Sequence, residues 1–166
     1  TELDPRVVGG GQERGIRSGT QDVAGAVGFA TAVELIVQER EHEATRLGQL
    51  KALILRRLQD GIPGLRVHGS LEACAPHILN VGIPHVDAEA LLFELDICGV
   101  AVSAGSACAS GAHSGSHVLT ALYGDDLEGS ALRFSLGKLS GAEDTEEATT
   151  RVLGVVQRLQ AASRAV

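Results

Sequence analysis

The pattern of apolar and polar positions predicts a long helix in the first third of the chain. Asp22 is a typical N-cap residue, and the apolar residues after it recur mostly at spacings of three and four, the period of an amphipathic helix. A charged section from Glu39 to Arg46 interrupts them. They resume at Leu47 and continue until the glycine- and proline-containing run Asp60–Gly64 ends the pattern. One long kinked helix and two helices in series both fit.

Four short segments after this break predict β-strands. Each is rich in β-branched or aliphatic residues and is bounded by residues that favour turns. The segments are residues 65–67, 77–83, 100–102 and 130–137. Helices are predicted between and after them, so we expect an α+β layer with a small, mostly antiparallel sheet covered by helices.

Three further helices are predicted around these strands. Asp87 is an N-cap residue for a helix that stops at Gly99. Ser116 is expected to begin a short helix that ends at Gly124, and the apolar spacing over residues 143–164 predicts a final amphipathic helix.

A run of small residues from Ser103 to Gly115 contains one thiol, Cys108, and one bulky side chain, His113. Such a run cannot bury enough apolar surface to offset its backbone entropy, so we expect a mobile surface loop. Free cysteines that serve structure are usually buried. Cys108 therefore indicates a reactive thiol, and the alternative is a glycine-serine linker that happens to contain a cysteine.

The glycine-rich run over residues 7–20 is a candidate phosphate-binding segment. It holds five glycines and two arginines together with serine and threonine hydroxyls, and glycine lets backbone amides approach an anion closely. However, no Walker lysine follows the run. A glycine-rich turn between domains is the commoner explanation.

Arg133 is a charged residue inside the predicted strand over residues 130–137. Because Leu132 and Phe134 flank it, strand alternation predicts that its side chain faces away from the core. One interpretation is that the Arg133 side chain is simply exposed to solvent. The other is a substrate clamp, since a guanidinium can bind a carboxylate with two hydrogen bonds.

Composition excludes several classes of function. The net charge of -7 argues against direct binding of nucleic acid. No apolar run is long enough to span a membrane. Three irregularly spaced cysteines make no disulfide framework, so we expect a cytoplasmic protein. The chain starts without methionine, and we expect it to be part of a longer polypeptide.

Five motifs, in this order and at these spacings, resemble the C-terminal half of a cysteine desulfurase of the NifS/IscS type. That type belongs to the class V aminotransferase family of pyridoxal-phosphate (PLP) enzymes. The motifs are GGGQERGIRSGT, APHILNV, VSAGSACASG, SHVLTALYG and LRFSLG. The resemblance implies a fold-type I enzyme. Residues 1–21 would then complete the large PLP-binding domain, and residues 22–166 would form the long helix and the small C-terminal domain.

The resemblance also implies roles for three residues. Cys108 matches the cysteine that takes sulfur from L-cysteine as a persulfide and leaves L-alanine. Arg133 matches the arginine that holds the carboxylate of the substrate. Thr20 matches the threonine that reaches the phosphate of PLP in the neighbouring subunit, which implies a homodimer. The sulfur would pass to a sulfur-acceptor or iron-sulfur scaffold protein, for iron-sulfur cluster or other thio-cofactor biosynthesis.

The chain departs from the family's pattern at two places. The family's cofactor lysine lies in a Ser-x-His-Lys motif upstream of the glycine-rich run. The only lysines here, Lys51 on a helix face expected to be charged and Lys138 after LRFSLG, have other neighbours. We therefore expect these residues alone to be inactive even when PLP is supplied. Gly115 replaces the family's usual proline, which should loosen the end of the cysteine loop.

The remaining cysteines and two histidines complete the candidate chemistry. A thiolate is the nucleophile in such a reaction, so a base near Cys108 would assist it, and His113 and His117 are candidates by proximity. Cys74 and Cys98 are expected to be structural.

Other functions stay open on the sequence alone. One is a zinc-binding or redox module that uses Cys74, His77, Cys98 and Cys108, although their spacings match no compact pair of metal ligands. Another is a non-catalytic dimerisation or scaffold-binding fragment. A third is an activity like that of selenocysteine lyase.

Overall fold

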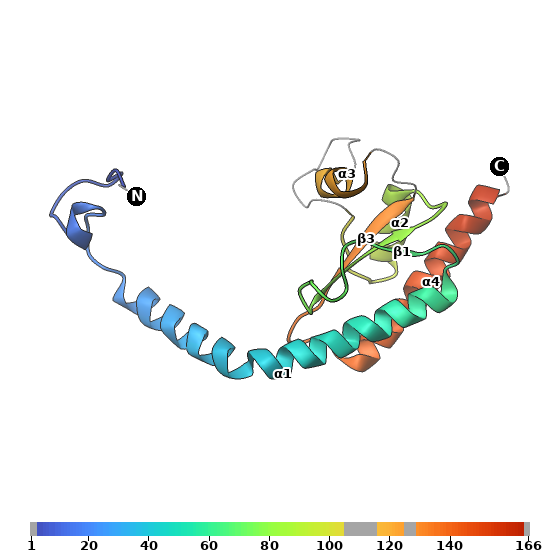
Figure 1. Ribbon diagram of the computed structural model, residues 1–166, viewed down its shortest axis with the longest axis horizontal. Coiled ribbons are helices and arrows are strands. Elements are labelled where there is room, and N and C mark those ends of the chain that lie inside the picture. The colour runs from blue at the N-terminus through green and yellow to red at the C-terminus, as the bar shows by residue number, and fades with distance from the viewer. Residues whose placement is uncertain (1–2, 105–115, 125–128, 165–166) are drawn as a thin grey trace. The chain divides into compact units, whose positions relative to one another are not determined.

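The computed structural model describes residues 3–104, 116–124 and 129–164 (Figure 1). They form two compact units, Thr1–Glu41 and His42–Val166. The helices and strands, in chain order, are η1 Glu13–Gly15, α1 Val23–Gly61, β1 Arg66–Val67, β2 Ile78–Ile83, α2 Ala88–Ile97, α3 His117–Tyr123, β3 Ser130–Ser135 and α4 Ala142–Arg164.

The first unit contains the glycine-rich run and the first half of α1. A bridge between Val7 and Arg17 closes the run into a loop around η1. Asp22 caps α1 as predicted, because its Oδ1 accepts a hydrogen bond from the backbone N–H of Gly25 at 2.8 Å. Seven large apolar side chains of this half of α1 are exposed within the described residues: Val23, Val27, Phe29, Val33, Leu35, Ile36 and Val37.

The second unit is a three-stranded antiparallel sheet with one buried face. The strand order is β1-β2-β3, and Val81 pairs with Leu132 while Leu79 pairs with Phe134. Because side chains alternate along a strand, these four share one face, where they are at most 6% exposed. The second half of α1 together with α2 and α4 packs on this face and completes one core. The helix residues of that core are Ile54, Leu55, Leu58, Leu91, Leu95, Val152, Val155 and Val156.

The close approach of α1 and α4 depends on Gly61. A Cβ atom added there would lie 2.4 Å from Cδ2 of Leu153, so a larger residue would force the Leu153 side chain to move. The opposite face of the sheet carries polar residues, and α3 lies on that side in Figure 1.

Most of the predicted elements are confirmed. The α+β class and the small antiparallel sheet are as predicted, and the first long helix is one continuous element, α1. The predicted strand over residues 100–102 is wrong. The backbone N–H of Val100 donates to the carbonyl of Leu95 in the turn that ends α2, so it is not available to pair with a neighbouring strand. Among the described residues after this turn, Ser103 forms the bridge to β3. The predicted domains, residues 1–21 and 22–166, stay predictions.

Candidate functional site

Four residues form a row across the polar face of the sheet. Asn80 of β2 pairs with Arg133 of β3, and the backbone N–H of His68 donates to the carbonyl of Asn80 at 2.9 Å. On the other side of β3, Ser103 bridges to Arg133. Residues that face each other in neighbouring strands project to the same side, so the row His68, Asn80, Arg133 and Ser103 lies opposite the core.

The pairing of Arg133 brings its side chain close to that of Asn80. The backbone N–H of Arg133 donates to the carbonyl of Ser103 at 2.7 Å, and the N–H of Ser103 donates to the carbonyl of Arg133 at 3.2 Å. Both polar backbone groups of Arg133 therefore point away from β2. This makes Asn80 and Arg133 a non-hydrogen-bonded pair, the kind in which opposed side chains lie closest.

The guanidinium of Arg133 has an unused donor. The residue is half-buried between Leu132 and Phe134 of the core, as strand alternation predicted. Its Nε atom is buried and has no hydrogen-bond partner among the described residues. A buried N–H without an acceptor is costly, so this atom is a natural contact for an anion brought by a ligand.

His68 and Asn80 form a side-chain pair beside Arg133. His68 Nδ1 and Asn80 Oδ1 lie 2.8 Å apart, and the His68 ring extends over Gly82, where an added Cβ would be 2.8 Å from its Nε2. The Asn80 oxygen is an acceptor, so this contact is a hydrogen bond in the His68 tautomer whose Nδ1 bears a hydrogen. The sequence reasoning missed this pair, although a polar residue inside the apolar strand ILNVGI was a usable signal.

Tyr123 ties α3 to the end of β1. Its hydroxyl oxygen accepts a hydrogen bond from the backbone N–H of Gly69 at 2.9 Å, and its ring centroid is 5.5 Å from that of His68. The predicted reactive residue, Cys108, and the candidate base His113 lie outside the described residues. The segment that contains them is bounded by Ser103, which is bonded to β3, and by α3, which is tied to β1.

Thr20 lies at the end of the glycine-rich loop, in the first unit. It is exposed, and Arg17 Nη1 donates to the carbonyls of Gly19 and Thr20, both at 3.1 Å. Gly19 has φ +110°, a conformation that favours glycine. Thr20 and Arg133 belong to different compact units, and each is placed only within its own.

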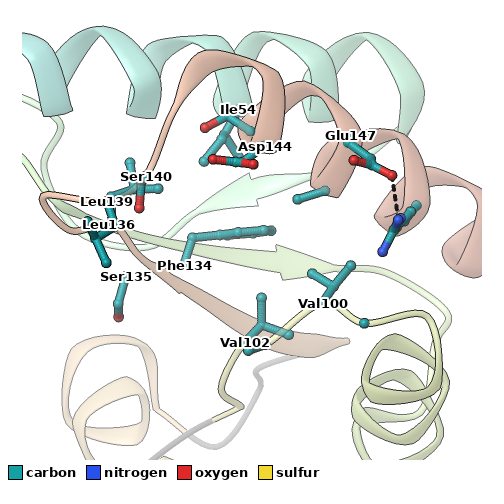
Figure 2. A pocket seen from close by; sticks show the side chains of 15 residues that line it. Ile54, Val100, Val102, Phe134, Ser135, Leu136, Leu139, Ser140, Asp144 and Glu147 are labelled. Atoms are coloured by element: carbon teal, nitrogen blue, oxygen red, sulfur yellow. Dashed lines mark hydrogen bonds and ion pairs between the residues drawn. The ribbon is translucent and has the colours of Figure 1, made fainter.

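A cavity of about 480 Å³ opens on the core side of the sheet rather than beside Arg133. Val100, Val102 and Phe134 line it, and α4 adds the ion pair between Glu147 and Arg151 (Figure 2). Since Phe134 and Arg133 are consecutive in β3, their side chains lie on opposite faces of the sheet. The cavity is therefore separate from the row that contains Arg133.

Comparisons of sequence relate the chain to known proteins. The family model described as aminotransferase class-V matches residues 7–147. A "Putative cysteine desulfurase IscS 1" of Bacillus subtilis (strain 168) is 41% identical over 160 residues, which are 95% of this chain and 42% of the relative.

The chain belongs to the aminotransferase class-V family. A solved "NIFS-LIKE PROTEIN" is similar to this class-V chain with a TM-score of 0.78 and 31% identity, over 96% of this chain and 40% of that one. A NifS-like protein from Rickettsia africae ESF-5 matches with a TM-score of 0.77 and 26% identity, over 95% of this chain and 41% of that one. The class-V chain thus spans about two fifths of the length of these relatives.

Neither a metal site nor a membrane span is found in the described part of the class-V chain. No group of three or more His, Cys, Asp or Glu side chains there could hold a metal ion, so Cys74, His77 and Cys98 do not form the zinc site considered above. No described helix is long and apolar enough to cross a membrane.

Proposed function

We propose that this chain is the C-terminal part of a PLP-dependent cysteine desulfurase. In this proposal Cys108 receives sulfur from L-cysteine, Arg133 binds the carboxylate of L-cysteine, and Thr20 contacts the phosphate of PLP in a partner subunit. The observation that carries the proposal is the bridge between Ser103 and Arg133, because it joins the segment that leads to Cys108 to the strand residue with an unused guanidinium donor.

Arg133 suits the carboxylate of an amino acid. A guanidinium offers donors in a planar fork that matches the two oxygens of a carboxylate, and the buried Nε of Arg133 gains the partner that it lacks when such an anion arrives. The backbone of Arg133 sits in the middle of four paired residues, which holds the start of its side chain in place. Binding at this position fixes the orientation of the substrate relative to the cysteine loop.

Thr20 and its neighbours fit a phosphate group. Thr20 is exposed and follows a glycine in a left-handed conformation, so an anion can approach the residue and the adjacent backbone closely. When bound, PLP acts as the electron sink for reactions of amino acids. Its Schiff-base lysine is not among the motifs of this chain, so that residue comes from outside these 166 residues.

Cys108 performs the sulfur transfer in this proposal. Its thiolate bonds to the sulfur of L-cysteine while the bond between that sulfur and the substrate Cβ breaks, and protonation of Cβ gives L-alanine. The product is a persulfide on Cys108. The outer sulfur of this persulfide passes to a sulfur-acceptor or iron-sulfur scaffold protein, and we place the reaction in the cytoplasm.

The exposed apolar half of α1 supports a larger assembly. An apolar surface of this extent usually marks an interface. This chain matches about two fifths of the length of its relatives. We propose that a segment equivalent to the rest of the relatives covers the exposed half of α1, within a homodimer.

A chimera tests the activity. The matching 42% of the Bacillus subtilis relative is replaced by this chain, and PLP absorbance and circular dichroism establish that the chimera folds and binds PLP. We expect L-alanine and sulfide from L-cysteine in the presence of a thiol reductant. A folded chimera that binds PLP yet releases neither product contradicts the proposal, and release from L-selenocysteine alone indicates a selenocysteine lyase.

A further inference from the structure

Lys51 is a buried basic residue, contrary to the expectation of a charged helix face. It lies in the apolar stripe of α1 next to Leu50 and Ile54 and is only 8% exposed. None of the ion pairs found between described residues includes it. A buried amino group without a carboxylate needs another partner, because burial of an uncompensated charge is costly.

The partner of Lys51 is Cys74, which was expected to be structural. Nζ of Lys51 lies 3.0 Å from Sγ of Cys74 and 3.2 Å from the carbonyl oxygen of Ala75. Cys74 itself is exposed, and its Sγ is also 3.3 Å from the carbonyl oxygen of Leu71. A thiol reachable from solvent is therefore in direct contact with a buried amine.

This contact suits two consecutive reactions. Lys51 Nζ faces Cys74 Sγ directly, so the basic side chain can stabilise an anionic sulfur and can also reach an oxidised one. Anionic sulfur is the form that attacks electrophiles such as peroxides. An uncharged amine is the form that attacks an oxidised sulfur, and a contact of 3.0 Å already places the two reacting atoms at near-attack distance.

Cys98 offers an internal comparison, because it too lies near a basic side chain. Its Sγ is 4.0 Å from Nη2 of Arg158, but that guanidinium is already paired with the carboxylate of Glu94 at 3.2 Å. Cys98 is also only partly accessible and packs against the core. Cys98 therefore lacks the two features of Cys74, which are exposure to solvent and contact with a basic side chain that has no carboxylate partner.

We propose that Cys74 and Lys51 form an oxidant-sensitive modification site, independent of the desulfurase activity. Hydrogen peroxide or an organic hydroperoxide oxidises the Cys74 thiol to a sulfenic acid and is itself reduced to water or an alcohol. The Lys51 amine then attacks the sulfenic sulfur, an S–N bond forms, the S–O bond breaks, and the hydroxyl leaves as water with one amine proton. The product is a sulfenamide that links α1 to the segment before β2, and an added thiol reverses it by forming a disulfide.

The first test compares the two cysteines in the whole chain. The protein is treated with limiting iodoacetamide and cleaved by a glutamate-specific protease, which separates Cys74 from Cys98 because Glu72, Glu89 and Glu94 lie around them. We expect Cys74 to be alkylated about tenfold faster than Cys98 or more, and the difference to disappear in urea. Cys108 lies on the same peptide as Cys98, so fragmentation of that peptide assigns the alkylated cysteine. Equal rates for Cys74 and Cys98 in the folded chain overturn the proposal.

The second test detects the link itself. After treatment with hydrogen peroxide, we expect the peptides that contain Lys51 and Cys74 to be joined, with a mass two hydrogen atoms below their sum, and to separate on addition of dithiothreitol. In Lys51→Arg, whose folding is checked by circular dichroism, dimedone should trap the Cys74 sulfenic acid and no link should form. Sulfenic acid without a link in the unaltered chain, or a link from Cys74 to another residue, overturns the proposal.

Discussion

The backbones of Ser103 and Arg133 are hydrogen-bonded in both directions, at 3.2 and 2.7 Å. This pair connects two parts of the candidate site, the strand that contains Arg133 and the segment that leads to Cys108. The alignment of those motifs is thus a property of backbone pairing, which a side-chain substitution at Ser103 does not disturb.

Replacement of Ser103 distinguishes backbone from side-chain effects. Ser103→Pro removes the N–H that donates to the Arg133 carbonyl, whereas Ser103→Ala keeps it. We expect Ser103→Pro to lower the rate of alanine formation by the chimera about tenfold or more, and Ser103→Ala to change it little. Equal activities of the two variants would show that the bridge plays no part in placing the cysteine loop.

Arg133→Ala should weaken the binding of L-cysteine. Loss of a charge-assisted hydrogen bond costs about 1.5–3 kcal/mol, so kcat/KM should fall about tenfold to a hundredfold, mainly through KM. Arg66→Ala is the matched control, because Arg66 is exposed on the same face of the sheet. If both variants keep the wild-type dependence on cysteine concentration, then Arg133 does not bind the substrate.

Tyr123→Phe tests the tie between α3 and β1. The change removes the acceptor of the Gly69 N–H but keeps the ring beside His68. We expect the free energy of unfolding in urea to fall by about 0.5–1 kcal/mol, the lower part of the range for a hydrogen bond, because Tyr123 is 47% exposed. A stability equal to that of the wild type would mean that water replaces the hydroxyl without cost.

Acid should weaken the link between α1 and the turn after β3. Arg46 donates to the carbonyls of Ser140 and Gly137 and to Glu43, and its hydrogen bond to that carboxylate lowers the pKa of Glu43. A lowered folded-state pKa adds stability above the unfolded value of 4.5, and this is lost as the pH falls through the folded value. Glu43→Gln should therefore be less stable than the wild type at pH 6, and the difference should shrink by pH 3.

Unfolding in urea at both pH values measures this difference. Asp60→Asn is a suitable control, since Asp60 is an exposed acid near the other end of the same helix. A difference between wild type and Glu43→Gln that is independent of pH would exclude an ionic contribution.

Local patterns predicted the parts of the fold that depend on neighbouring residues. The cap at Asp22, the end of α1 near Gly61 and the outward face of Arg133 follow from capping, glycine chemistry and strand alternation. Residues 100–102 look like a strand by composition, but the turn after α2 takes up the Val100 N–H, which local composition does not reveal.

Contacts between distant residues could not be predicted in the same way. The pairing of Asn80 with Arg133 depends on strand register, and the contact of Lys51 with Cys74 joins residues 23 positions apart. The burial of Lys51 did leave a signal, because the residue lies between Leu47, Leu50, Ile54 and Leu55 in the apolar stripe. The roles of Thr20, Arg133 and Cys108 stay predictions.

We propose that Cys108 takes sulfur from L-cysteine, and the mass of the Cys108 peptide tests this step. The chimera is incubated with L-cysteine, treated with an alkylating agent without reductant, and digested. We expect the Cys108 peptide to gain one sulfur atom beyond the alkylated form, and Cys108→Ser to keep the PLP absorbance but to form neither persulfide nor alanine. Alanine formation at the wild-type rate by Cys108→Ser, or a persulfide found only on Cys74 or Cys98, would contradict it.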